Sequence, residues 1–148
     1  MHYELFMGAA LGEARAALDR GERPHGAAAV LGDALVASSH EEVASRNDPT
    51  AHAVILALQE AAKRLDSRSL SGLTVFTTVE PCAMCVGALL EADADCLVYA
   101  LSDPIAGAAG SVLQLANNPA LPRRLDLISG ILRSDAAELA DAAASRVP

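Results

Sequence analysis

The sequence contains no tryptophan, and aromatic residues make up only 3% of it. A core built around large rings is therefore excluded, and Ala, Val, Leu and Ile must supply the buried surface. The chain can form such a core without staples, because 52% of its 148 residues are apolar. Since this length is typical of one domain, we expect a single domain over residues 1–148.

Long apolar runs are also absent. Asp, Glu, Arg or Gly interrupts every apolar segment before the roughly 18 to 20 residues that a membrane helix needs. The N-terminal segment lacks a basic stretch and a small-residue cleavage site, and it is typical of an amphipathic helix rather than a signal peptide. The three cysteines are too few and too closely spaced for a secreted disulfide framework. We therefore expect a cytoplasmic protein with no membrane segment.

Positive charge is scarce relative to negative charge. The chain has 11 Lys and Arg residues against 19 Asp and Glu residues, so its net charge is −8. Such a protein repels nucleic acid at long range, which argues against RNA binding. The argument is not decisive, because arginines distant in the sequence can still gather on one face of the folded chain.

Hydrophobic periodicity predicts alternating helices and strands. The expected helices cover residues 4–20, 50–65, 83–92, 112–116 and 135–145. A hairpin that turns at Gly32-Asp33 is expected within 26–38, with further strands at 73–79, 96–101 and 125–129. This order predicts an α/β fold, a mixed sheet with helices on both faces.

A possible metal site is formed by His52 and the Cys82-x-x-Cys85 pair, each at the expected start of a helix. The positive end of a helix dipole lowers thiol pKa values, so thiolates become available to a metal. One imidazole and two thiolates suit zinc, and three protein ligands leave one position open, as in catalytic sites. The pattern therefore favours a catalytic zinc site.

Two other interpretations of the cysteine pair remain open. A C-x-x-C that follows a strand and begins a helix also describes a thioredoxin-like redox pair. A structural zinc site would need a fourth protein ligand, and the available residues are Cys96, His25, His40 and His2. Cys96 lies in an apolar run, which is more typical of a core residue.

Two longer motifs carry a family resemblance: Asp48-Pro-Thr-Ala-His-Ala53 and Glu80-Pro-Cys-Ala-Met-Cys85. With Pro24-x-Gly26-Ala27 and the segment 107–111, they make nearly the whole chain resemble the zinc-dependent nucleobase deaminases of the cytidine deaminase superfamily. The branch that it resembles most contains tRNA-adenosine and guanine deaminases. The resemblance implies a three-layer α/β/α fold with a mixed five-stranded sheet, in which His52, Cys82 and Cys85 hold Zn²⁺. The implied reaction is hydrolytic release of ammonia from an amino-substituted nucleobase or nucleoside.

The sequence departs from this family at Val54. The family motif is H-x-E, and its glutamate moves the proton of the attacking water. Valine cannot move a proton, so a contribution of roughly 10²- to 10⁴-fold to the rate is lost. We therefore expect an inactive or severely weakened deaminase, either an inactivated variant of an enzyme or a descendant with another role.

The resemblance also indicates which residues surround the substrate. It suggests His25, Asn47, Ala53 and Glu80 as substrate-binding candidates. A turn role is favoured for Asn47, and a role in supporting the loop and the metal ligands is favoured for Glu80. Glu41 and Glu42 lie in a polar segment, where we expect solvated side chains.

The expected partner is a small-molecule base or nucleoside, because the last helix is acidic and the net charge is −8. A tRNA substrate remains the alternative, since Arg123 and Arg124 could contact phosphates. The resemblance also implies a homodimer. A zinc-containing binding protein without turnover is a third possibility, for which Val54 is the direct argument.

Overall fold

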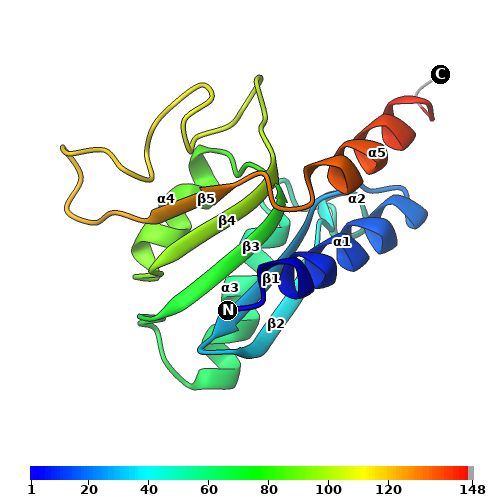
Figure 1. Cartoon of the computed structure of the whole chain (residues 1–148). Coiled ribbons are helices and arrows are strands. Elements are labelled where there is room, and N and C mark those ends of the chain that lie inside the picture. Colours follow the sequence, from blue (N-terminus) through cyan, green and yellow to red (C-terminus); the bar gives the residue numbers. More distant parts are fainter. Residues whose placement is uncertain (147–148) are drawn as a thin grey trace.

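A five-stranded sheet forms the centre of the computed structural model, which describes residues 1–146 (Figure 1). The strand order is β2-β1-β3-β4-β5. β1 is antiparallel to both of its neighbours, whereas β3, β4 and β5 run parallel. The predicted mixed sheet is therefore confirmed. The strands are β1 (Gly26–Leu31), β2 (Ala34–His40), β3 (Leu73–Val79), β4 (Cys96–Leu101) and β5 (Asp126–Ser129).

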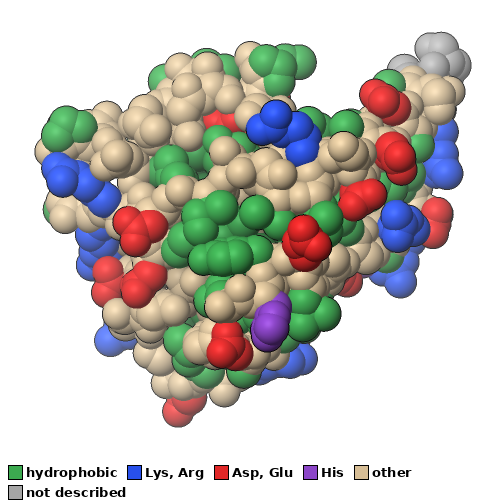
Figure 2. Space-filling view, in the orientation of Figure 1, with side chains coloured by type: hydrophobic (Ala, Val, Ile, Leu, Met, Phe, Trp, Pro, Cys, Tyr) green, Lys and Arg blue, Asp and Glu red, His purple; other side chains and the backbone are tan. Residues whose placement is uncertain are grey.

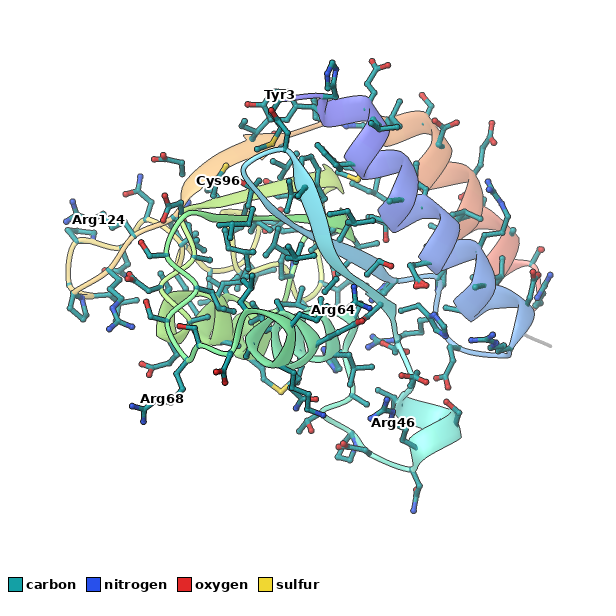
Figure 3. The ribbon with its side chains drawn as sticks, turned by 90° about the horizontal axis from the view of Figure 1, so that it is seen from below. Tyr3, Arg46, Arg64, Arg68, Cys96 and Arg124 are labelled. Carbon is teal, nitrogen blue, oxygen red and sulfur yellow. The ribbon has the colours of Figure 1, made fainter. Side chains whose placement is uncertain are left out.

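Helices cover both faces of this sheet (Figures 1 and 3). The helices are α1 (Tyr3–Asp19), α2 (Val43–Arg46), α3 (Ala53–Leu65), α4 (Ala83–Glu91) and α5 (Arg133–Ala144). One apolar cluster joins α1 and α5 to the sheet, and a second joins α3 and α4 to it. The predicted three-layer α/β/α fold is confirmed. None of the described helices is long and apolar enough to cross a membrane.

Small residues in β1 let helices approach both faces of the sheet closely. Ala27 and Ala29 pack in the cluster with α3, while Ala28 packs in the cluster with α1. At Gly26, an added Cβ would collide with the backbone of α1 at Ala10 and Ala14. The start of β1 is thereby fixed directly against α1.

The prediction of a helix at residues 112–116 is wrong. These residues form turns and an isolated bridge between Ala109 and Gln114. Their backbone donors are used elsewhere, because the N–H groups of Val112 and Leu113 both donate to the carbonyl oxygen of Gly107. The short helix α2 was expected to be loop, and the helix predicted from residue 50 begins at Ala53.

Candidate metal centre and pocket

Two helix N-termini meet at one edge of the sheet. Cys82 is the N-cap of α4, which follows the carboxyl end of β3, and His52 is the N-cap of α3. Both residues have extended backbone conformations, so the helices begin immediately after them. The helix dipoles therefore place positive potential where thiolates would lie.

His52, Cys82 and Cys85 form a group positioned to hold a metal ion, since their ligand atoms all lie within 4.8 Å of one another. Nδ1 of His52 is 3.6 Å from Sγ of Cys82 and 3.5 Å from Sγ of Cys85. Zn–S and Zn–N bonds of about 2.3 and 2.05 Å at a tetrahedral angle require an S···N separation of about 3.6 Å. The donor set and the two S···N separations thus fit zinc.

No fourth protein ligand joins this group among residues 1–146. Cys96 packs against the apolar cluster of α1 and α5, on the opposite face of the sheet. The ring of His40 is hydrogen bonded to Arg20 at 3.0 Å. Three protein ligands match an open site better than a closed structural one.

The two thiols differ in acidity. A hydrogen bond from Cys85, together with the nearby His52, lowers the pKa of Cys82 to about 5. The same hydrogen bond and burial raise the pKa of Cys85 well above its usual value. The acidic thiol of Cys82 favours metal binding, because a metal binds the deprotonated form of cysteine.

Glu80 anchors the loop that closes one side of the site. Its buried carboxylate accepts hydrogen bonds from the backbone N–H groups of Asp103 at 3.1 Å, Ala109 at 3.0 Å and Ser111 at 3.1 Å. The hydroxyl of Ser111 donates to it as well. Although burial alone raises the pKa of Glu80, these hydrogen bonds lower it below the usual range. These contacts tie residues 103–111 to the end of β3.

A cavity of about 60 Å³ adjoins the three ligand residues. Of the sequence-predicted substrate residues, it is lined by His25, Ala53 and Glu80, and Val54 lines it too. Asn47 is not part of the lining. It is exposed, has a left-handed φ of 49° and is the C-cap of α2.

Val54 belongs both to the cavity wall and to the core. Its side chain is only 4% exposed and packs in the cluster with α3 and α4. The wall is apolar where the family motif has a carboxylate.

Glu41 is the residue that sequence reasoning missed. We expected a solvated side chain, which is wrong, because Glu41 is 2% exposed. Nε of Arg23 donates to both of its carboxylate oxygens, at 2.9 and 3.0 Å. The signal was the hairpin: Gly26 pairs with His40, so residues 25 and 41 must be neighbours. Glu42 is partly exposed and pairs with Arg46 at 3.0 Å.

Comparison with known proteins agrees with this geometry. The family model of the MafB19-like deaminases matches residues 1–119. The tRNA-specific adenosine deaminase of Bacillus subtilis is 33% identical over 132 residues, which cover 89% of this chain and 82% of the relative. That of Agrobacterium fabrum is 37% identical over 134 residues, with 90% and 88% covered.

Solved structures show the same similarity. A structure from a study of A-to-I editing by tRNA:A34 deaminases superimposes with a TM-score of 0.88 at 37% identity, covering 90% of this chain and 97% of that one. The guanine deaminase of Nitrosomonas europaea gives 0.80 at 27% identity, with 96% and 84% covered.

The fold and the His/Cys/Cys group define a deaminase of the cytidine-deaminase-like class. The chain belongs to the MafB19-like deaminase family. Its homologues are deaminases, so it is an enzyme by resemblance.

Proposed function

We propose that this protein is a zinc-dependent hydrolytic deaminase of an amino-substituted nucleobase or nucleoside, severely weakened by Val54. The observation that carries the proposal is the group of His52, Cys82 and Cys85, whose spacing of 3.5 and 3.6 Å fits tetrahedral zinc beside a cavity. When bound, zinc would activate a water as the nucleophile.

The chain's own residues would shape the rest of the reaction. Ala53 and Val54 form an apolar wall that excludes bulk water from one side of the ring. Glu80 holds the loop that contributes Asp103 and Ala106 to the cavity. The Val54 side chain neither accepts nor donates a proton, so the acid–base contribution of roughly 10²- to 10⁴-fold is missing from this position.

The test compares the wild type with Val54→Glu and, as a matched control, Val54→Gln. We expect near-stoichiometric zinc in all three proteins. Ammonia release from a panel of amino-purines and amino-pyrimidines, free and as nucleosides, should rise by roughly 10²- to 10⁴-fold only with Glu, because Gln has the size but not the basicity. Absence of zinc would refute the proposal and return Cys82 and Cys85 to the redox interpretation. A zinc-loaded but inert Val54→Glu would favour the binding protein without turnover.

A small substrate is proposed over tRNA because of how charge is distributed on the protein. On the face shown in Figure 2, Lys and Arg side chains are scattered among Asp and Glu. In Figure 3, Arg46, Arg68 and Arg124 project outward from separate segments. Together with the net charge of −8, this arrangement disfavours a phosphate backbone.

A tRNA adenosine deaminase is the second candidate. It is favoured by the relatives at 33% and 37% identity, which are tRNA-specific adenosine deaminases. The assay for it is conversion of adenosine to inosine in a tRNA transcript by Val54→Glu. Activity on tRNA without activity on free bases or nucleosides would replace the small-substrate proposal.

We also infer a cytoplasmic homodimer. Free thiols at Cys82, Cys85 and Cys96 suit a reducing compartment. Ile105, Val112 and Leu113 are exposed, at 87%, 52% and 50%, on the loop beside the site, which suits burial against a second copy. Light scattering on the purified protein would measure the mass, and a monomer would contradict this inference.

A further inference from the structure

A buried carboxylate and a histidine stand beside the cavity without a role in the function proposed above. Glu41 follows β2 and His25 precedes β1, and the backbone N–H of Glu41 donates to the carbonyl oxygen of His25 at 3.0 Å. Because β1 is antiparallel to β3, its first residues lie at the carboxyl end of β3, where Cys82 begins α4. The topology alone therefore brings Glu41 and His25 to the candidate metal centre.

The side chains of Arg23, Glu41 and His25 also lie close to one another. Arg23 holds the Glu41 carboxylate through Nε, and Glu41 in turn raises the pKa of Arg23. Oε1 of Glu41 lies 3.9 Å from Nδ1 of His25. The ring of His25 lines the cavity, yet it is not a member of the metal-ligating group. His25 thus occupies a place from which it can contact a bound molecule but not complete the ligand set.

A carboxylate at Nδ1 of a histidine fixes which nitrogen carries the proton. The 3.9 Å between Nδ1 of His25 and Oε1 of Glu41 is longer than a hydrogen bond, and such contacts commonly shorten when a substrate closes the site. Once the Nδ1–H group donates to Glu41, Nε2 is left as the unprotonated acceptor of the ring and can serve as a general base.

We propose that His25, oriented by Glu41, moves the protons of the deamination in this chain, in the place of the carboxylate that Val54 lacks. This inference rests on the proposed function. Nε2 of His25 accepts one proton from the attacking water as the C–O bond forms, and delivers it to the adjacent ring nitrogen. It then carries the second proton from the new hydroxyl group to the amine, the C–N bond breaks, and ammonia leaves with a carbonyl group remaining.

The charges around His25 are consistent with a neutral ring at pH 7. Burial is the main reason that its pKa falls to about 4. Arg23 and His52 disfavour the imidazolium further, whereas Glu41 and Asp103 favour it. A base that is neutral in the resting site is ready to accept a proton, and Glu41 stabilises the imidazolium that then forms.

The experiment is a double-mutant cycle on the full-length, zinc-loaded protein. Wild type, His25→Gln, Val54→Glu and the double variant are assayed for ammonia release on the substrate that Val54→Glu identifies. His25→Gln should lower the wild-type rate by roughly 10- to 100-fold. In the Val54→Glu background it should change the rate less than about threefold, because the restored glutamate makes the histidine redundant. Glu41→Gln should repeat this pattern, with the smaller loss expected of a positioning residue. In the zinc-free protein, nitrogen NMR of the imidazole should show His25 protonated on Nδ1 in the wild type, and this preference should weaken in Glu41→Gln; a wild-type ring protonated on Nε2 would overturn the inference.

His40→Gln is the matched control, because His40 is also a buried histidine, lies 3.6 Å from the carboxylate of Glu13, and does not line the cavity. It should leave the rate unchanged in both backgrounds. Equal losses from His25→Gln in both backgrounds would overturn the inference, since a merely structural or substrate-holding role predicts them. A wild-type rate no higher than that of His25→Gln would also overturn it while Val54→Glu remains active. A zinc-loaded Val54→Glu without activity would instead refute the proposed function itself.

Discussion

Replacing Glu80 by alanine should remove the hydrogen bonds that hold the loop of residues 103–111 and lower the free energy of unfolding. The carboxylate receives three backbone N–H donors and one hydroxyl, from Asp103, Ala109 and Ser111. Hydrogen bonds to a charged acceptor contribute about 1.5–3 kcal/mol each. The donor at Ala109 is buried, but those at Asp103 and Ser111 are only partly buried, so water can satisfy them after some relaxation.

When the buried donor at Ala109 is counted in full and the partly buried donors are strongly discounted, the expected loss in the free energy of unfolding is about 3 to 5 kcal/mol. At a urea dependence of about 2 kcal/mol per molar, the midpoint should fall by about 1.5 to 2.5 M. Glu80→Gln should lose roughly half as much, because the amide keeps one acceptor oxygen but turns its NH₂ group toward another donor. Equilibrium urea unfolding, followed by circular dichroism, measures all three proteins.

The matched control is Glu138→Ala. Glu138 is exposed within α5, where alanine is a good helix former, so its removal should leave the midpoint nearly unchanged. A Glu80→Ala variant that unfolds within about 1 kcal/mol of the wild type would refute the reasoning, because the buried donor at Ala109 alone should cost more.

Three further outcomes are expected. Gly26→Ala should destabilise the fold by about 3 kcal/mol or more in urea unfolding, because the new Cβ meets the backbone of α1. At Gly12, which lies within α1, an added Cβ meets nothing, so Gly12→Ala should stabilise the fold by about 0.5–1 kcal/mol. Equal effects of the two substitutions would contradict this reasoning. His25 has a folded pKa of about 4 against an ordinary 6.5, so the unfolded state binds more protons between these values and stability falls as pH drops through them. This loss of stability amounts to at most about 3 kcal/mol, and it should disappear in His25→Gln. If the free energy of unfolding of this variant depends on pH as that of the wild type does, His25 is not the cause. Chelation of the metal should lower the Tm of the wild type but not of Cys85→Ser, in which the ligand set is already broken; equal shifts would mean that the metal binds elsewhere.

The elements with strong local signals were predicted from the sequence almost residue by residue. β3 was expected at residues 73–79 and occupies Leu73–Val79, because its β-branched run lies between Gly72 and Glu80-Pro81. The predicted grouping of the candidate ligands is found in the structure, where His52 and Cys82 each stand directly before a helix. In both cases the deciding interactions lie within a few residues along the chain.

The failures share a different cause, which is a partner distant in the sequence. Residues 112–116 have helical composition, but the hydrogen bonds of Glu80 and Gly107 determine their backbone. Glu41 has polar neighbours along the chain, so the local sequence predicts an exposed side chain. Its burial depends on Arg23, 18 residues away, which the register of the hairpin brings beside it.

The residue at position 54 affects proton transfer at the site but not the geometry of the candidate metal ligands. Val54 packs in the apolar cluster of α3 and α4. The ligand atoms of His52, Cys82 and Cys85 are positioned by the starts of α3 and α4 and by the loop that Glu80 holds, and the side chain at position 54 takes no part in either. Losing the glutamate therefore removes a proton carrier without removing the metal-binding geometry. Since Val54 also lines the cavity, a glutamate there can direct its carboxylate into open space rather than into the core. Zinc content alone consequently cannot distinguish a weakened deaminase from a binding protein, and only the rate that returns with Val54→Glu can.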